Sequence, residues 1–350
     1  MTPTPAGLSC PIPLDDYPEI TLAHGGGGRL MHRLIEEMML PVFGSPDPSV
    51  RHDGAVLASP GRRLAFTADS HVVTPLFFPG GDIGSLAIHG TVNDLAVCGA
   101  KPLWLSVGFI LEEGLPMETL WRVVRSMGEA AVKACVQVVT GDTKVVERGK
   151  ADGVFINTAG IGSIAEGVVV NPSRISPGDA VIVSGDIGRH GIAVMSVREG
   201  MGLVTTVTSD LAPISPITLD LLSAGLDVHC MRDLTRGGLA GGLYETVSAA
   251  GLTARIEEDR VPVREDVLGA CELLGFDPLY VANEGRFILF LPQAEAEAAL
   301  NVIRRHPGGE LASMIGSVAS RSSAPVIMRS LIGSERIVDL LSGEQLPRIC

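Results

Sequence analysis

The feature that most constrains the fold is a regular alternation of apolar runs of strand length with longer segments of helical periodicity. Between the apolar runs, hydrophobic residues recur at the three- and four-residue spacing of a helix. In the first half of the chain we expect strands at residues 63–73, 103–111, 136–146 and 153–164 and helices at 84–100 and 117–134. Strands interleaved with long helices predict a mixed α/β (α+β) fold.

Two such series divide the chain. Turn-forming residues cluster at 171–179, and a second series of strands and helices follows up to about residue 330. A chain of 350 residues is also long for a single core. We therefore predict a Pro-rich extended arm at 1–18, two mixed α/β domains at 19–168 and 169–333, and a flexible tail at 334–350.

Charge and cysteine spacing narrow the class of protein. The formal net charge of −13 disfavours a surface that binds nucleic acid or anionic lipid. No signal peptide is visible, and the apolar run at 102–111 is too short to span a bilayer. The six cysteines are far apart and include no CxxC pair, so neither a disulfide framework nor a zinc site is expected. We expect a cytoplasmic protein with no nucleic-acid and no membrane partner.

A glycine-rich loop precedes the first expected helix. Four glycines at residues 25–28 are followed by helical periodicity from Leu30 to Met39, which Pro41 is expected to end. Backbone N–H groups of such a loop and of the helix N-terminus can bind phosphate oxygens. The loop lacks the Gly-Lys-Ser/Thr ending of a Walker A motif, and a plain flexible turn is an equally good interpretation.

Five aspartates occupy similar positions among small residues at expected strand ends and helix edges. They are Asp53, Asp69, Asp94, Asp142 and Asp233. Mg²⁺ takes oxygen ligands and keeps several waters, so a few carboxylates together with nucleotide phosphates would hold it. A cap or turn role explains any one of these residues, whereas the set of five favours a polyphosphate site.

Lys144 and Glu284 are the candidate acid–base residues. Lys144 follows Thr-Gly-Asp at the end of an expected strand, where it is either a solvated charge or a group that neutralises phosphate or exchanges a proton. Glu284 precedes the strand at 286–292, where it is either a surface partner of Arg286 or a general base. His190 has no second histidine at metal-ligand spacing, so we expect it to make a structural hydrogen bond.

Taken together and in order, these segments resemble the HypE family of hydrogenase maturation factors, carbamoyl dehydratases of the PurM-like ATP-binding superfamily. The matching stretches span nearly the whole chain and include AHGGGGRLMHRLI, VTGDTKVVERG, SGDIGRHGIAVMS, RDLTRGGLA, VANEGRF and the terminal PRIC. The resemblance implies two PurM-like domains and a mobile C-terminal tail. It also implies a homodimer formed through the N-terminal sheet, with ATP bound beside the interface.

The resemblance further implies an activity and its partners. The carbamoyltransferase HypF would carbamoylate the terminal residue, Cys350, and ATP would drive dehydration of the thiocarbamate to a thiocyanate. The cyano group would then pass to iron on the HypC–HypD scaffold for the NiFe hydrogenase. Lys144 and Glu284 match proton-transfer residues of the family. The expected nucleotide-binding residues are Gly25, Gly26, Gly27, Asp69, Asn93, Asp94 and Asp142, and the expected Mg²⁺ ligands are Asp53, Asp69, Asp94 and Asp233.

The residues leave two other functions open. Another PurM-like ATP-dependent synthetase or kinase would act on a free small molecule and would have no need of a terminal cysteine. A scaffold or metal chaperone would use Cys350 as a ligand, but isolated cysteines without nearby histidines disfavour it. The dehydratase chemistry suits an ATP enzyme, because phosphorylating the carbamoyl oxygen turns it into a leaving group.

Overall fold

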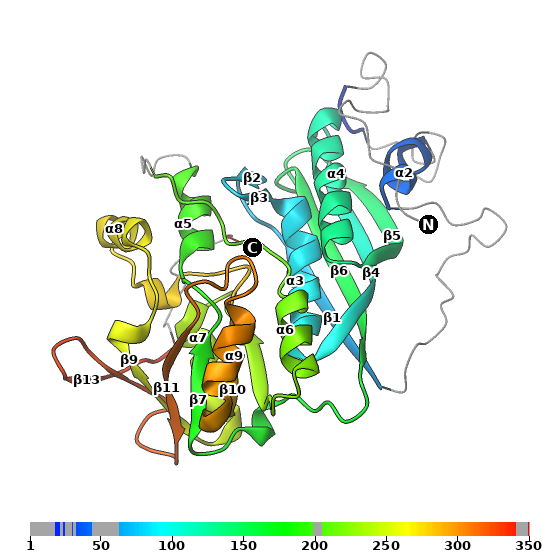
Figure 1. Ribbon diagram of the computed structural model, residues 1–350. Coiled ribbons are helices and arrows are strands. Elements are labelled where there is room, and N and C mark those ends of the chain that lie inside the picture. The colour runs from blue at the N-terminus through cyan, green and yellow to red at the C-terminus, as the bar shows by residue number, and fades with distance from the viewer. Residues whose placement is uncertain are drawn as a thin grey trace.

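The computed structural model describes residues 18–21, 24, 30, 33–43, 63–198, 205–340 and 349. Within these ranges, two sheets, each covered by helices, lie beside each other, as Figure 1 shows. Strands and helices follow each other in the expected order, which confirms the mixed α/β prediction. None of the helices in the described ranges combines the length and apolar composition needed to cross a membrane.

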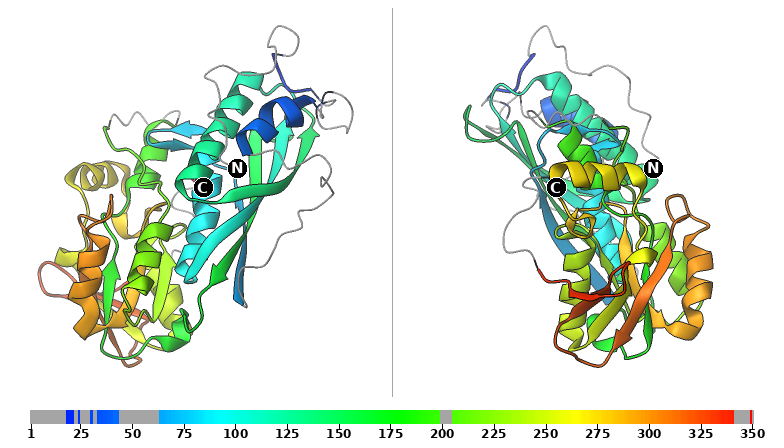
Figure 2. Two further views of the ribbon diagram at one scale, coloured as in Figure 1. Left: turned by 45° about the vertical axis from the view of Figure 1, so that its right-hand side comes forward. Right: turned by 90° about the vertical axis from the view of Figure 1, so that its left-hand side faces the viewer.

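The first sheet has four strands in the order β1-β6-β4-β5. Its elements are β1 (Arg63–His71), β4 (Ala100–Glu112), β5 (Gln137–Val146), β6 (Val154–Ile164), α3 (Ile83–Val97) and α4 (Met117–Lys133). A short hairpin of β2 (Phe77–Phe78) and β3 (Gly81–Asp82) precedes α3, and η2 (Leu34–Met39) and α2 (Leu40–Phe43) pack near α4. Figure 2 shows α3 and α4 side by side on one face of this sheet.

The two faces of this sheet differ in burial because side chains alternate along each strand. On β4, Leu105, Val107 and Phe109 point toward the helices and are buried. On the other face, Leu64, Phe66 and Ile110 are 50%, 71% and 42% exposed. The chain therefore presents an apolar sheet face that none of the described residues buries.

The second sheet has seven strands in the order β13-β12-β9-β11-β7-β10-β8. These are β7 (Asp179–Val183), β8 (Cys230–Asp233), β9 (Thr253–Glu257), β10 (Phe287–Pro292), β11 (Ser313–Ala319), β12 (Val326–Arg329) and β13 (Glu335–Ile337). The helices are α5 (Arg189–Ser196), α6 (Ser215–Ser223), α7 (Gly238–Ala250), α8 (Glu265–Leu274) and α9 (Ala296–Ile303). The core side chains of α7 lie on one face, and those of α6 and α9 on the other, so β7 and β10 are almost wholly buried.

One predicted helix end differs from the structure, whereas β5 ends at Val146 as expected, with Lys144 inside the strand. The first helical segment continues past Pro41 to Phe43, because η2 runs directly into α2 at Leu40. β13 pairs with β12 beyond residue 333, and the domain boundaries stay predictions.

Asn93 on α3 fixes the loop of residues 205–214 between the two sheets. Its Nδ2 donates hydrogen bonds to the carbonyl oxygens of Ala212 and Glu284, both at 3.0 Å. Its Oδ1 accepts the N–H of Ile214 at 2.9 Å. The buried Asn93 side chain of the first domain thus holds both the loop of residues 205–214 and the segment that precedes β10.

We expect Asn93→Ala to lower the free energy of unfolding by about 2–4 kcal/mol, because it leaves three buried backbone groups without a partner. The measurement is urea unfolding followed by circular dichroism. Asn157→Ala is the control, because Asn157 also donates two hydrogen bonds but is exposed. Equal destabilisation in both variants would contradict the role of Asn93.

Candidate functional site

Four acidic side chains from both domains act on one another through their charges where α3 faces β1 and the second sheet. Asp69 comes from β1, Asp94 from α3, Asp233 from the end of β8, and Glu284 from the segment before β10. Asp94 Oδ2 accepts a hydrogen bond from Thr67 Oγ1 at 2.9 Å. These are three of the predicted aspartates together with the predicted base.

Close packing of α3 on β1 brings Asp69 and Asp94 together. Gly90 on α3 lies against β1, where an added Cβ would be 3.1 Å from His71 Cε1 and 3.4 Å from Asp69 Oδ2. Thr67 and Asp69 are two residues apart on β1, so they face α3 from the same side of the strand. A larger residue at position 90 would push the helix away from the acidic residues.

The carboxyl groups raise one another's pKa. Burial, followed by the charges of Asp233 and Asp69, raises the pKa of Asp94 to about 7. Burial and then Asp69 raise the pKa of Asp233, although Arg232 opposes this. Burial raises the pKa of Glu284 well above its ordinary value, and the charges of Asp210 and of the three aspartates add to the effect. The cluster therefore holds protons or needs cations.

Glu284 is buried, with 3% of its surface exposed, and its Oε1 has no hydrogen-bond partner. Asp210 Oδ2 accepts the N–H groups of Glu284 and Gly285 at 3.2 and 2.9 Å. Arg286 points elsewhere and forms an ion pair with Asp186 at 2.6 Å. The interpretation of Glu284 and Arg286 as a surface pair is therefore wrong.

The acidic cluster offers only carboxylate donors to a Mg²⁺ ion. Across the described ranges, no three His, Cys, Asp or Glu side chains are arranged as ready metal ligands. The cluster nevertheless consists of carboxylate oxygens, the donors that Mg²⁺ prefers, and it lacks enough cations to balance its charge. Asp69, Asp94 and Asp233 thus fit a magnesium ion that is also bound by waters and phosphates. Asp53, the fourth predicted ligand, lies outside the described residues.

Two arginines beside the cluster were missed by sequence reasoning. Arg232 and Arg236 lower the pKa of Asp233 through their charges. Arg236 directly precedes the left-handed Gly237 and Gly238, where α7 begins. Cations at a helix N-terminus form an arrangement that binds phosphate. The RDLTRGGLA segment could have revealed Arg236, because this arginine directly precedes two glycines and an expected helix.

Asp142 and Lys144 do not join the cluster within one chain. Both side chains are 63% exposed, and Lys144 Nζ lies 3.1 Å from Asp142 Oδ2. They point to the open face of the first sheet, on the edge strand farthest from β1. With three strand spacings of about 4.8 Å, roughly 14 Å separates the two edges.

The remaining predicted residues are placed as follows. Gly25, Gly26, Gly27 and Cys350 lie outside the described residues. Both donors of the Asn93 side chain are used by backbone carbonyls, so its nucleotide-binding role stays a prediction beside a clear structural one. His190 makes two structural hydrogen bonds, as expected.

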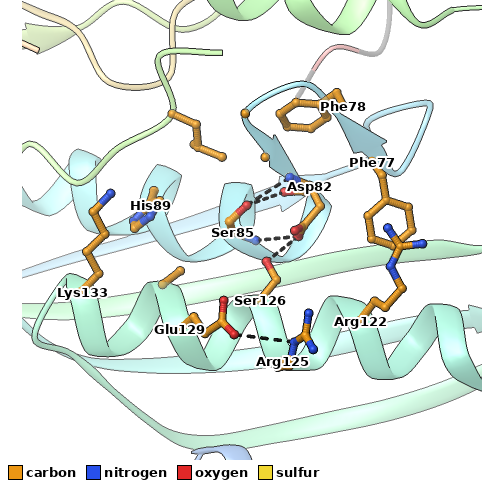
Figure 3. A pocket seen from close by; sticks show the side chains of 14 residues that line it. Phe77, Phe78, Asp82, Ser85, His89, Arg122, Arg125, Ser126, Glu129 and Lys133 are labelled. Atoms are coloured by element: carbon orange, nitrogen blue, oxygen red, sulfur yellow. Dashed lines mark hydrogen bonds and ion pairs between the residues drawn. The ribbon is translucent and has the colours of Figure 1, made fainter. Parts of the chain in front are cut away.

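A pocket of about 520 Å³ lies apart from this cluster, between α3, α4 and the β2–β3 hairpin (Figure 3). Phe77, His89, Arg122 and Lys133 are among its lining residues. Asp82 stands at its centre but is already engaged, because it accepts hydrogen bonds from Ser126 and from the first turn of α3. None of the predicted site residues lines this pocket.

Two protein-family models together match most of the chain. Residues 51–164 match the N-terminal domain of AIR synthase related proteins, and residues 176–328 match the C-terminal domain of the same family. The two matched segments correspond to the two sheets. They agree with the PurM-like fold that the sequence predicted.

Individual relatives cover nearly the whole chain. The carbamoyl dehydratase HypE of Rhodobacter capsulatus is 50% identical over 95% of this chain and 98% of its own length. A solved structure of the hydrogenase maturation protein HypE in complex with ATP is 48% identical, covers 94% of this chain and 99% of its own, and has a TM-score of 0.90. A HypE–HypF complex structure is 45% identical, covers 88% and 99%, and has a TM-score of 0.77.

The raised pKa of Asp94 makes stability depend on pH. A carboxyl whose pKa is higher in the folded state stabilises it below the unfolded pKa, and this contribution is lost as pH rises through about 7. We expect the Asp94→Asn protein to lose about 2–3 kcal/mol less stability than wild type between about pH 5 and pH 8. Urea unfolding at several pH values measures this.

Asp227→Asn is the matched control for this experiment. Arg174 lowers the pKa of Asp227, so its contribution is lost only at acid pH. Its variant should keep the wild-type slope between pH 5 and pH 8. A wild-type slope in Asp94→Asn would show that Asp94 does not hold a proton in the folded protein.

Proposed function

Because the chain belongs to the HypE family of carbamoyl dehydratases, we propose that it uses ATP to convert an S-carbamoyl group on its own Cys350 into an S-cyano group. The observation that carries the proposal is the position of the neighbouring residue. Ile349 is only 5% exposed and packs in a cluster that includes Val194 and Ala282. Its carbonyl oxygen lies 2.7 Å from Nε2 of His190, on which the charge of Asp210 acts, and Asp210 accepts the N–H of Glu284, so Ile349 lies near the segment of Glu284.

The proposed reaction removes the elements of water from the thiocarbamate. The γ-phosphoryl group of ATP is transferred to the carbamoyl oxygen, and the C–O bond then breaks with phosphate as the leaving group. The nitrogen loses both protons as the C≡N bond forms. The products are the S-cyano cysteine, ADP and phosphate.

Glu284 is the proposed acceptor of a nitrogen-bound proton. A carboxyl with a strongly raised pKa binds a proton tightly once it is ionised, as a weakly acidic N–H requires. Its Oε1 has no partner that would compete with substrate. Asp210 holds the Glu284 backbone, which keeps the carboxyl in place.

ATP and Mg²⁺ are the proposed cosubstrate and cofactor. Asp69, Asp94 and Asp233 would hold the ion, and Arg236 at the start of α7 would bind phosphate oxygens. When bound, the cation would neutralise phosphate charge and offset the carboxylates that raise the pKa of Glu284. ATP binding is supported by the similar HypE structure in complex with ATP.

A homodimer formed through the open face of the first sheet is the proposed assembly. Leu64, Phe66 and Ile110 give this face an apolar surface suited to burial. A two-fold axis parallel to the strands would set β5 of one copy opposite β1 of the other. Lys144 of the partner subunit would then approach the edge of the sheet that carries Asp69.

The proposed partners follow from the family. A HypE–HypF complex supports HypF as the carbamoyl donor to Cys350. We propose that the HypC–HypD scaffold receives the cyano group as a ligand for the NiFe hydrogenase. A PurM-like enzyme acting on a free substrate is disfavoured, because it gives no reason for a docked chain end.

Mass spectrometry of the intact protein tests the function. After incubation with HypF, carbamoyl phosphate and ATP, we expect a carbamoyl group on Cys350 that loses one water only when the dehydratase has ATP. The carbamoylated protein should first be purified away from HypF, so that the effect of ATP belongs to the dehydratase alone. Cys350→Ser is the control and should remain unmodified. Steady ATP turnover on a soluble substrate with Cys350 unmodified would refute the proposal.

The same experiment tests the catalytic residues. Glu284→Gln and Lys144→Ala should be carbamoylated at the wild-type rate but should dehydrate at least about 100-fold more slowly, as expected for a lost acid–base group. Lys150→Ala, which removes an exposed lysine after β5, should not slow either step. Normal dehydration by both site variants would refute these roles.

Phe66→Glu tests the dimer. A charge on the apolar face should raise the dimer dissociation constant by about 100-fold or more, as expected for a buried unpaired charge. Analytical ultracentrifugation measures it. Leu273→Glu, at an 81% exposed position on α8, is the control and should leave the dimer intact. A Phe66→Glu protein that dimerises like wild type would exclude this face.

A further inference from the structure

A buried histidine binds the backbone one residue before the terminal cysteine. His190 on α5 has no exposed surface, and its Nε2 lies 2.7 Å from the carbonyl oxygen of Ile349. Its Nδ1 lies 2.9 Å from Ser209 Oγ. Buried Ile349 is thus held by a polar contact as well as by packing.

The direction of these hydrogen bonds follows from the chemistry of the partners. A carbonyl oxygen can only accept, so Nε2 must carry the proton and donate to Ile349. Burial lowers the pKa of His190 even though Asp210 opposes this, so the ring is neutral and Nδ1 accepts from Ser209. Ser209 Oγ in turn accepts the N–H of Leu211 at 3.1 Å. The chain of bonds selects one tautomer, the one that can bind the tail.

This histidine stands where several parts of the protein meet. Phe78 of the β2–β3 hairpin makes an edge contact with its ring at 5.3 Å between centroids. Ser209 also donates its N–H to the carbonyl of Pro79 in that hairpin at 2.8 Å. Gly80 leaves room for this approach, because a Cβ there would lie 2.8 Å from the nitrogen of Ser209. The binding site for Ile349 therefore needs the first domain, the connecting loop and α5 in their observed positions.

We propose that His190, oriented by Ser209, is a positioning residue that holds the chain end at Ile349 during dehydration and releases it for carbamoylation. The proposal rests on the proposed function of Cys350. It adds a residue that determines whether Ile349 is held for dehydration or released for carbamoylation. Asp210, the neighbour of Ser209, holds Glu284, so the same loop positions the tail and the proposed base.

An anchor at the backbone of Ile349 suits a chain whose next residue, Cys350, changes its side chain during the reaction. Cys350 would be a thiol, a thiocarbamate and a thiocyanate in turn, and a contact to sulfur would be broken at each change. The Ile349 carbonyl stays the same throughout, and its Cα lies about 3.8 Å along the chain from that of Cys350. One anchor therefore serves every chemical state of the cysteine.

The first test compares two substitutions in the full-length protein. His190→Phe keeps a ring against Phe78 but removes the donor, whereas His190→Gln keeps an N–H that can reach a carbonyl. For His190→Phe we expect HypF-dependent carbamoylation at the wild-type rate or faster, and dehydration slowed about 10-fold, as for a lost buried hydrogen bond. His190→Gln should recover at least part of the dehydration rate. Equal rates in all three proteins would overturn the proposal.

The second test needs neither HypF nor ATP. Iodoacetamide labelling of Cys350, measured on the C-terminal peptide by mass spectrometry, reports how often the tail leaves its site. His190→Phe should be labelled about 10-fold faster than wild type, and Ser209→Ala, which frees the tautomer, roughly 2- to 5-fold faster. Exposed Cys135 is the internal reference and should react equally in all variants.

The two tests separate this proposal from the proposed function. Unchanged Cys350 labelling in both His190→Phe and Ser209→Ala overturns the positioning role, whatever the enzyme does. Faster labelling in these variants supports the docking contact even if the wild-type protein never dehydrates a carbamoyl group, which would refute only the function. Thermal unfolding identifies a misfolded His190→Phe protein, and Ser209→Ala then decides the outcome.

Discussion

The site depends on the loop of residues 205–214, whose Ser209, Asp210 and Ile214 are buried. This loop is hydrogen-bonded on both sides. Asn93 binds its far end, and Asp210 binds the backbone before β10. Gly285 has no side chain because a Cβ would collide with the carbonyl oxygen of Asp210. These contacts replace water at buried polar groups, so the loop cannot shift without leaving some of them unsatisfied. The position of Glu284 is therefore set by this loop and by Asn93 of the first domain.

The acidic cluster opposes the same arrangement. Asp94, Asp233 and Glu284 all have a raised pKa, which means that their ionised forms destabilise the closed domains. The hydrogen bonds of the loop keep these groups together at that cost. Binding of a cation would relieve this repulsion. The clustered carboxylates thus lower the stability of the free protein and favour binding of a cation.

Strands and helices could be predicted where they have a clear apolar period, as α4 and β4 do. Asp69 and Asp94 could be found because small residues surround them at a strand and a helix that pack together. The burial of Glu284 could not, since its polar neighbours suggested a surface. Its burial depends on Asp210, which is 74 residues away, and on the pairing of Arg286 with Asp186. Such contacts between distant segments leave no local pattern.

Lys144 shows why motifs alone do not make a site. Its segment, like that of Glu284, matches the family, yet β5 puts it on the face of the sheet opposite to α3. Within one chain the two residues cannot share a proton, because the width of the sheet separates Lys144 from the acidic cluster. Both can act on one carbamoyl group only if a second copy contributes the lysine. If dehydration needs both residues, only the dimer can carry it out. The exposed side chain of Phe66 then contributes to catalysis by stabilising that dimer.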